Sequence, residues 1–322
     1  MPSPTSQRTQ PIDLRAVFGA EPRRMLEDVA SFVEDQGYAG NFGAQWTRYR
    51  DTQIDSRNGT TISRDFLEAL LAHPLEQLEG LTVLEVGAGA GRFTEHLVQH
   101  AARVVAVDLS HAILVNAARG SPNLVLAQVN LYDPPSILLP IDLVLCRGVI
   151  QHTPDPPRTI SELHQLVRPG GRVVFDVYGP GRLGRLGPKY VWRSILPRII
   201  SWDAFRTFLE RDAAHLLRLR RRLSSFLPGR TRRLLDYFIP IWDYQGVLPL
   251  GERELAEWCV LDTLDALYAA YDQPMTFDEI VEVLSGLPCD ILSTDPGMNF
   301  FRTRRRESSP EGPVSLTGEL EV

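Results

Sequence analysis

The stretch Leu84–Thr94, LEVGAGAGRFT, decides the fold, because it places three glycines at every second position directly after an apolar run. The apolar run predicts a buried strand. The glycines predict a sharp turn into a helix whose first amide groups stay free. Glycine suits such a turn because it adopts unusual φ values and lets a ligand approach the backbone closely. We therefore expect a ligand-binding turn that contains Gly87, Gly89 and Gly91.

Around this turn, between about residues 81 and 178, short β-branched runs alternate with helical patterns. The predicted strands are 81–87, 103–108, 123–129, 141–146 and 171–178, and the predicted helices are 91–100, 110–119 and 157–168. Such alternation implies right-handed crossovers and a parallel, doubly wound sheet.

The C-terminal part of the chain shows a different pattern. A helical period over 277–287 precedes two strand-like runs, 289–295 and 299–305, which a tight turn joins. Two strands joined this tightly must be antiparallel. We therefore expect an α/β fold with a mostly parallel, seven-stranded sheet that ends in an antiparallel hairpin.

Residues 179–275 do not fit the alternation. They open with a glycine-rich stretch and contain helical patterns such as 203–227. We expect them to form a helical cap over the carboxyl ends of the strands, where ligands bind in open α/β sheets. The expected organisation is a disordered tail (1–11), an N-terminal helical lid (12–79), the α/β core (80–178), the cap (179–275), the final helix and hairpin (276–304) and a second disordered tail (305–322).

Two classes of ligand compete for the glycine turn, and a turn that binds nothing is the third reading. A dinucleotide turn has the pattern G-x-G-x-x-G, but Arg92 stands where its third glycine would be, and Gly91 is the third glycine instead. Glu85, two residues before the first glycine, can anchor an ammonium group, often through water. A dinucleotide has no such group, so the pattern favours a ligand that carries one.

In these residues the chain resembles the class I S-adenosylmethionine-dependent methyltransferases, strongly over 80–178 and in outline over 276–304. The family signature is an acid followed by G-x-G-x-G, which Glu85 and the three glycines match, and then an acid at the end of the second strand, which Asp108 matches. The resemblance implies an enzyme with S-adenosylmethionine as cofactor and S-adenosylhomocysteine as product. It also implies that Asp108 accepts both ribose hydroxyls, while Ser110 is available to cap the next helix.

Further positions follow from the resemblance. Asn130 and Leu131 stand where the family usually has an aspartate and an apolar residue that hold the adenine, and an asparagine oxygen can still accept from the adenine amino group. Arg147 replaces a small residue and could reach the methionine carboxylate or the substrate. The implied cofactor site comprises Trp46, Glu85, Gly87, Gly89, Gly91, Arg92, Phe93, Asp108, Leu109, Asn130, Leu131 and Arg147.

The segment 41–67 resembles a lead-in that covers the cofactor in a subset of the family. Its aromatic residues and one just before it either present ring faces to the adenine or the sulfonium or pack in the core, since three of them have helical spacing. These residues are Tyr38, Phe42, Trp46 and Tyr49.

His152, in the loop after the fourth strand, is the candidate general base, because imidazole exchanges protons near neutral pH. A structural or cofactor-side role is the alternative. His164 falls within a helix and is expected to be a packing or surface residue, and no partner is evident for His96. No histidine and carboxylate cluster has metal-site spacing, so no metal is predicted.

The cap contains a basic helical stretch. Its apolar residues recur on one face, which we expect to pack inward: Leu216, Leu219, Leu223 and Phe226. The arginines 218 and 220–222 would then be solvated. The alternatives for them are an acidic substrate, a membrane surface or lipid-linked substrate, and nucleic acid. Trp242 and Tyr244 are expected to line an apolar substrate pocket.

Bulk composition narrows the class of function. The 322 residues are 43% hydrophobic and 23% charged, as in ordinary globular proteins, and a net charge of −6 gives no reason to expect nucleic acid. The cysteines are too far apart for a disulfide framework or a zinc site. With no signal-peptide core and no apolar run that spans a bilayer, a cytoplasmic location is expected.

These observations predict a methyltransferase that acts on an oxygen or nitrogen, less readily a carbon, of a small molecule. The substrate would be acidic or apolar and would belong to a bacterial secondary-metabolite pathway. One alternative is a non-catalytic binding protein that keeps the cofactor site. Another is a methyltransferase for a lipid-linked or membrane-surface substrate, with peripheral membrane contact through the basic cap helix.

Overall fold

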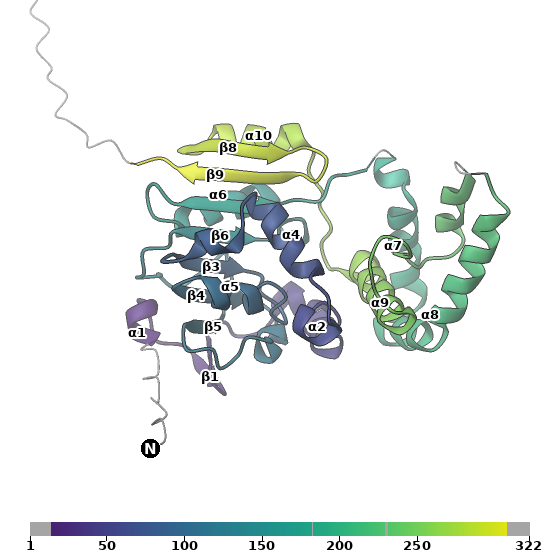
Figure 1. Ribbon diagram of the computed structural model, residues 1–322, viewed down its shortest axis with the longest axis horizontal. Coiled ribbons are helices and arrows are strands. Elements are labelled where there is room, and N and C mark those ends of the chain that lie inside the picture. The colour runs from purple at the N-terminus through teal and green to yellow at the C-terminus, as the bar shows by residue number, and fades with distance from the viewer. Residues whose placement is uncertain (1–13, 182, 229–230, 308–322) are drawn as a thin grey trace, which may run out of the picture.

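The structure, a computed structural model, describes residues 14–181, 183–228 and 231–307. Within these residues the centre is a sheet in the order β1-β2-β5-β4-β3-β6-β7-β9-β8 (Figure 1). The parallel strands are β3 (Thr82–Val86), β4 (Arg103–Asp108), β5 (Leu124–Gln128), β6 (Leu143–Cys146) and β7 (Arg172–Asp176). The hairpin of β8 (Cys289–Asp295) and β9 (Phe300–Arg305) pairs antiparallel with β7. The predicted α/β fold is confirmed.

The sheet is wider than predicted at one edge. The segment expected to be a helical lid also forms β1 (Arg24–Leu26) and β2 (Val29–Ser31), so the sheet has nine strands rather than seven among the described residues. β2 pairs parallel with β5 through Ala30 and Ala127, and β1 closes the hairpin. The hairpin covers the edge of β5, which would otherwise expose unpaired backbone groups. Three-residue strands are too short to show a period in the sequence.

Helices cover both faces of the sheet because its central strands are apolar on both sides. On one face, Leu84 and Val144 pack with Ile160 of α6 (Pro156–Leu166) and with α10 (Phe277–Ser285). On the other, Val83 packs with Leu97 of α5 (Thr94–His100) and with α4 (Ile62–Leu71) and η2 (Leu75–Leu78). Both clusters of core residues position the carboxyl ends of the strands.

The predicted helix 110–119 is wrong. The segment forms only the 3-10 turn η3 (His111–Val115), in which Ser110 acts as the cap by accepting a hydrogen bond from the Ala112 amide at 3.3 Å. The helix stops because the Ala117 amide donates to the carbonyl of Ala90 at 2.8 Å. This bond ties the chain to the glycine turn.

The cap lies beside the sheet, next to the ends of the parallel strands (Figure 1). It consists of α7 (Pro188–Ile199), α8 (Trp202–Ser225), η6 (Thr231–Tyr237) and α9 (Glu252–Tyr268). The lid helix α2 (Gly40–Arg48) packs on α9, where Gln45 donates to the carbonyl of Leu261 at 3.2 Å. The lid and the cap therefore form one wall, although more than two hundred residues separate them.

The face on which α8 packs differs from the prediction. Its buried residues are Phe205, Leu209, Ala213 and Leu217, a row with a spacing of four. Of the predicted inward row, Leu216 is half-buried in the cap core, but Leu219, Leu223 and Phe226 are 48%, 39% and 76% exposed. The buried row ends at Leu217. Beyond it, the last two turns of α8 carry apolar side chains that are exposed.

Short helical turns complete the chain: α1 (Leu14–Val17), η1 (Gly37–Ala39), α3 (Asp55–Asn58), η4 (Ile150–His152) and η5 (Gly184–Leu186). The predicted tails lie outside the described residues, except that Arg305 belongs to β9 and the next two residues follow it. In the part of the chain that is described, no helix has the length and apolar character needed to cross a membrane.

Candidate active site

A cavity of about 700 Å³ lies where the glycine turn, the lid and the cap meet. Its walls come from the carboxyl ends of β3, β4 and β6, from α2 and from α9. The predicted cofactor residues that line it are Trp46, Glu85, Gly87, Gly89, Arg92, Phe93, Asp108, Leu109, Leu131 and Arg147. Gly91 and Asn130 do not belong to this lining.

The glycine turn has left-handed backbone at its first two glycines, with φ of +79° at Gly87 and +50° at Gly89. A Cβ at Gly87 would lie 2.1 Å from Cγ2 of Val149, so this glycine allows the loop after β6 to approach. A Cβ at Gly89 would meet only the Trp46 ring, at 4.0 Å. Gly89 therefore presents its backbone to the cavity, as a ligand-binding turn requires.

Gly91 has a different role in the structure. Its φ is +94°, and a Cβ there would lie 2.5 Å from Oδ1 of Asn116 and 2.7 Å from the backbone nitrogen of Ala117. The third glycine of the signature is therefore needed for the contact between the turn and the segment after η3.

Asp108 ends β4 and lines the cavity beside the turn. Its Oδ2 accepts a hydrogen bond from the Gly89 amide at 2.8 Å, and its Oδ1 accepts one from the Ser110 amide at 2.7 Å. Burial raises the pKa of this carboxyl group, while the two amides oppose the shift. Each oxygen keeps a lone pair for a ligand, which fits the role predicted for Asp108 toward the ribose.

Glu85 lies in the middle of the sheet, with Ala106 on one side and Leu145 on the other. Its Oε2 accepts a hydrogen bond from the Thr94 hydroxyl at 2.6 Å. Burial raises the pKa of Glu85 to about 8. A nearby cation stabilises the ionised form of a buried carboxyl group that has only one hydroxyl partner. The site therefore suits a ligand ammonium group.

Asn130 uses its side chain locally. Its Oδ1 accepts a hydrogen bond from the Tyr132 amide at 3.0 Å. The neighbours Val129 and Leu131 line the cavity instead. The adenine contact that we predicted for Asn130 stays a prediction, and in this arrangement it would have to share that oxygen.

Arg147 lies in the cavity wall as an ion-paired residue. Its Nη1 is 2.9 Å from Oδ2 of Asp176, and its guanidinium carbon lies 4.6 Å from the Phe66 ring centre and 5.6 Å from that of Tyr178. The Nε atom is buried and has no hydrogen-bond partner among the described residues. Arg147 thus keeps one donor uncommitted.

Arg92, by contrast, has neutral hydrogen-bond partners. It donates from Nε to the Ser63 hydroxyl at 3.1 Å and from Nη1 to the Gln53 amide oxygen at 2.8 Å. Burial and the charge of Arg147 lower the pKa of Arg92 to about 10. No carboxylate in the described part of the chain forms an ion pair with it, so this cation is available for an anionic ligand group.

The aromatic residues of the lead-in divide between the two readings that the sequence left open. Tyr38, Phe42 and Trp46 line the cavity. Tyr49 is buried in the cap core, and its hydroxyl donates to Oε1 of Glu210 at 2.8 Å. Trp242 and Tyr244 line the cavity as predicted.

His152 also lines the cavity, at the end of η4. Its Nδ1 donates to the carbonyl of Tyr271 at 3.0 Å, and its Nε2 is buried and has no hydrogen-bond partner in the described residues. The second histidine considered, His164, is a packing residue. Its ring nitrogens lie 2.8 Å from the Ile160 carbonyl and 2.8 Å from the Thr303 hydroxyl.

The residues that the cap brings to the cavity were not predicted from the sequence. Lys189 comes from α7, and Trp258, Asp262 and Asp265 come from α9. The signal that was present is the pair of acids three residues apart in the otherwise apolar stretch WCVLDTLDALY, residues 258–268. In such a stretch a buried acid needs a partner or a function.

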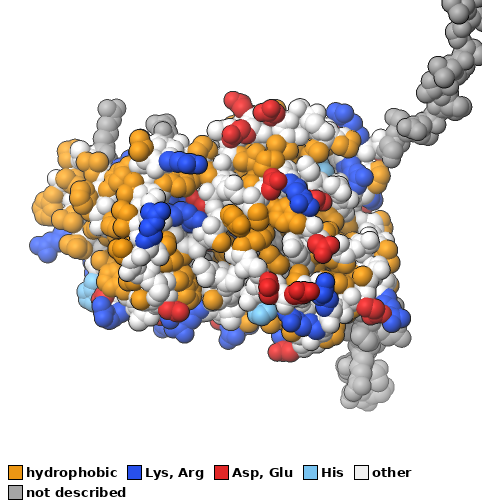
Figure 2. All heavy atoms as spheres, turned by 180° about the vertical axis from the view of Figure 1, so that it is seen from behind, with side chains coloured by type: hydrophobic (Ala, Val, Ile, Leu, Met, Phe, Trp, Pro, Cys, Tyr) orange, Lys and Arg blue, Asp and Glu red, His pale blue; other side chains and the backbone are white. Residues whose placement is uncertain are grey.

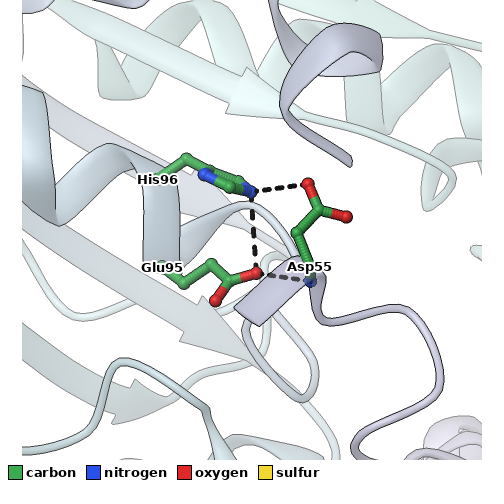
Figure 3. A group of neighbouring side chains, drawn as sticks. All are labelled: Asp55, Glu95 and His96. Atoms are coloured by element: carbon green, nitrogen blue, oxygen red, sulfur yellow. Dashed lines mark hydrogen bonds and ion pairs between the residues drawn. The ribbon is translucent and has the colours of Figure 1, made fainter. Parts of the chain in front are cut away.

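His96, for which the sequence showed no partner, belongs to a buried cluster with Asp55 and Glu95 (Figure 3). Its Nε2 lies 3.1 Å from Oδ2 of Asp55 and 3.5 Å from Oε1 of Glu95. The ligand atoms lie within 4.8 Å of one another, a spacing that a metal ion could use. However, the amides of Ser63 and Arg64 already donate to the Asp55 carboxylate, and the Asp55 amide donates to Glu95. We therefore interpret the cluster as a hydrogen-bonded link between α3, α4 and α5.

The site combines an open α/β sheet, a left-handed glycine turn after one strand and a fixed carboxylate at the end of the neighbouring strand. This combination defines a class of proteins that bind a nucleoside-containing ligand at this edge of the sheet. Residues 53–236, more than half of the chain, match the methyltransferase domain family. The chain belongs to this family. The resemblance stated from the sequence is confirmed, and with it, at the level of the family, the enzyme class and the S-adenosylmethionine cofactor.

Individual relatives match shorter parts. The biotin biosynthesis bifunctional protein BioHC of Cellvibrio japonicus is 27% identical over 198 residues, which are 56% of this chain and 36% of that protein. A ubiquinone biosynthesis O-methyltransferase of Coxiella burnetii is 30% identical over 130 residues, 38% of this chain and 55% of the relative. The chain thus spans between about a third and just over half of these relatives. The structure of magnesium protoporphyrin IX methyltransferase (ChlM) from Synechocystis, with bound SAH, is similar with a TM-score of 0.44 and 16% identity, over 84% of this chain and 97% of that one.

Proposed function

We propose that this protein transfers a methyl group from S-adenosylmethionine to an oxygen or nitrogen atom of a small molecule. The observation that carries the proposal is the single cavity shared by the glycine turn and the cap. Gly89 and Asp108 face it from the sheet, and Trp242 and Asp265 face it from the cap. A cofactor on the sheet side and an acceptor on the cap side would then meet inside one enclosure.

The cofactor side has groups that fit each part of S-adenosylmethionine. Asp108 would accept from the ribose hydroxyls, and Glu85 would face the ammonium group of the methionine part. Arg92 forms no ion pair with a carboxylate of the described residues. It would face the carboxylate of the methionine part. When bound, the cofactor supplies an electrophilic methyl group, so the protein needs only to orient a nucleophile and exclude water.

The acceptor side would supply the remaining functions. Trp242, Tyr244 and Trp258 give it apolar walls, and His152 supplies an unpartnered ring nitrogen that can take a proton from a hydroxyl or an amine. The names of the two curated relatives, biotin and ubiquinone biosynthesis, support a place in small-molecule biosynthesis, which we include in the proposal.

Titration calorimetry of the full chain with S-adenosylmethionine and S-adenosylhomocysteine tests the cofactor. We expect both to bind at one site, because they share the ribose, adenine and amino acid groups that the cavity would recognise. Absence of binding by the folded protein would refute the proposal. A protein that binds both but transfers no labelled methyl group to any small molecule of a bacterial extract would be the non-catalytic binding protein instead.

A specific observation favours a membrane-surface substrate as a second candidate. The cap tip, defined as residues 218–228 and 231–238, exposes apolar side chains, with Phe226 and Phe238 both 76% exposed. Figure 2 shows hydrophobic side chains and Lys or Arg side chains gathered over the cap. The arginines of the tip that pair with no acid among the described residues are Arg218, Arg222, Arg232 and Arg233. Apolar groups beside free cations suit an anionic lipid surface.

The double variant Phe226→Ser/Phe238→Ser is expected to lose vesicle binding by roughly tenfold or more, because two exposed rings can no longer enter the interface. Flotation with phosphatidylcholine vesicles, with and without phosphatidylglycerol, measures it. Leu138→Ser is the matched control. Leu138 lies on the surface of the α/β region 80–178 and is 59% exposed, so this variant should bind vesicles as the unchanged protein does. If the unchanged protein does not float with phosphatidylglycerol vesicles, the second candidate is wrong.

A further inference from the structure

Two side chains face each other without a hydrogen bond on the side of the cavity where the methyl acceptor would bind. Nε2 of His152 lies 3.9 Å from Oδ2 of Asp265. Nε2 of His152 and Oδ1 of Asp265 are both buried, and neither has a hydrogen-bond partner among the described residues. The two side chains come from different parts of the chain, the loop after β6 and helix α9, and both line the cavity.

The two atoms without a partner, Nε2 of His152 and Oδ1 of Asp265, are both hydrogen-bond acceptors. Because Nδ1 of His152 donates to the Tyr271 carbonyl at 3.0 Å, a neutral ring carries its proton on Nδ1 and has a lone pair on Nε2. The ionised Asp265 carboxylate has only lone pairs. A distance of 3.9 Å is too long for a direct hydrogen bond in either protonation state of the histidine.

The nearby cations are already engaged elsewhere. Lys189 forms an ion pair with Asp272, with Nζ 2.9 Å from Oδ1, and Arg193 donates to the carbonyls of Ala266 and Ala269. Asp262, the other acid of α9 in the cavity wall, accepts from the Trp258 indole at 3.1 Å and from the Gln53 amide at 3.3 Å. Asp265 has no such donor. The Asp265 side chain is 21% exposed, but its Oδ1 atom is buried without a donor among the described residues. A buried oxygen without a donor is costly, so its presence at a cavity indicates a ligand that supplies donors.

We infer that His152 and Asp265 bind an amine nitrogen of the methyl acceptor, and that the protein is an N-methyltransferase for a primary amine. An amine with two hydrogens can donate to both acceptors at once. A hydroxyl group has one hydrogen and would leave one acceptor without a donor. The assignment of the amine to the acceptor rests on the proposed function, whereas the amine site itself rests on this pair of residues.

In the transfer step the amine reacts as the neutral base. Its lone pair forms the new N–C bond while the C–S bond breaks, and the bonding electron pair stays on sulfur, which becomes a neutral thioether. The nitrogen takes the positive charge and then loses one proton to Nε2 of His152. Asp265 faces the positive charge that develops on the nitrogen, which stabilises the charged form.

Benzylamine and benzyl alcohol test the inference, because they have the same shape and differ in the donor group, and because Trp242, Tyr244 and Trp258 offer an aromatic wall. By calorimetry or ligand-observed NMR, we expect the protein saturated with S-adenosylhomocysteine to bind benzylamine about tenfold more tightly than benzyl alcohol, or better, as a charge-assisted hydrogen bond provides. The variant Asp265→Asn should lose this preference. Equal binding of the two probes by the unchanged protein, or a preference that survives Asp265→Asn, overturns the inference.

Asp262→Asn is the matched control, since Asp262 lines the same cavity but already has donors, and it should keep the amine preference. Asp265→Asn should not lower the melting temperature, because it keeps the shape of the side chain and removes a charge whose Oδ1 accepts no hydrogen bond from the described residues. Its affinity for S-adenosylhomocysteine should stay within about twofold of the unchanged protein, because the residue is outside the cofactor half. If neither cofactor form binds, the proposed function fails, and the probes, used without it, still decide whether an amine site is present.

Discussion

Replacing Asp108 by alanine is expected to weaken S-adenosylmethionine binding by roughly 1.5–3 kcal/mol, a loss of about 10- to 150-fold in affinity. The amides of Gly89 and Ser110 hold the carboxylate at the cavity wall. The lone pairs that the protein leaves free can accept from a ligand, so the ribose hydroxyls would form charge-assisted hydrogen bonds with this carboxylate. Titration calorimetry at one pH and one salt concentration measures the loss.

The control for this prediction is a carboxylate that also accepts a hydrogen bond from a backbone amide but lies away from the cavity. Asp142, at the other end of the sheet, accepts from the Thr82 amide at 2.8 Å and forms an ion pair with Arg168. Asp142→Ala should lower stability without changing cofactor affinity. Unchanged affinity in Asp108→Ala would show that the ribose lies elsewhere, while an equal loss in both variants would show that the effect is structural.

The parts of the fold that the sequence predicts best are those in which pattern and burial agree locally. The bounds of β4 and β8 are those predicted, because each strand is a run of strand-forming residues ended by a turn or a polar residue. The hairpin β1–β2 and the short η3 were missed, since neither has enough residues to show a period. Their structure depends on what they contact, the edge of β5 and the glycine turn.

The candidate site divides in the same way. Gly89 and Asp108 belong to one strand–turn–helix–strand unit, residues 82–108. The motif of this unit predicts its geometry, so the place of both residues at the cavity follows from the sequence. Asp265 reaches His152 only because α9 docks on the core, and nothing in the local pattern encodes that meeting. The exposed face of α8 shows the same limit: periodicity indicates which side chains share a helix face, but the partner helix decides which face is buried.

The second large effect concerns the glycine that the signature would assign to the ligand. Gly91→Ala is expected to lower the free energy of unfolding by about 3 kcal/mol or more, because the new Cβ would lie 2.5 Å from Oδ1 of Asn116 and 2.7 Å from the backbone nitrogen of Ala117, at a φ of +94°. The asparagine side chain can shift, but the backbone nitrogen is fixed by its bond to Ala90. Urea unfolding, followed by circular dichroism, measures the change.

Gly89→Ala is the matched variant, two residues away in the same turn. Its Cβ would meet only the Trp46 ring at 4.0 Å, at a φ of +50°, so we expect a loss of only about 1 kcal/mol in stability from the left-handed backbone. The same methyl group enters the cavity, so cofactor affinity should fall steeply while the fold persists. If Gly91→Ala instead proves as stable as the unchanged protein and loses only affinity, then the third glycine serves the ligand. The contact with Asn116 would then be a consequence of the turn and not the reason for its glycine.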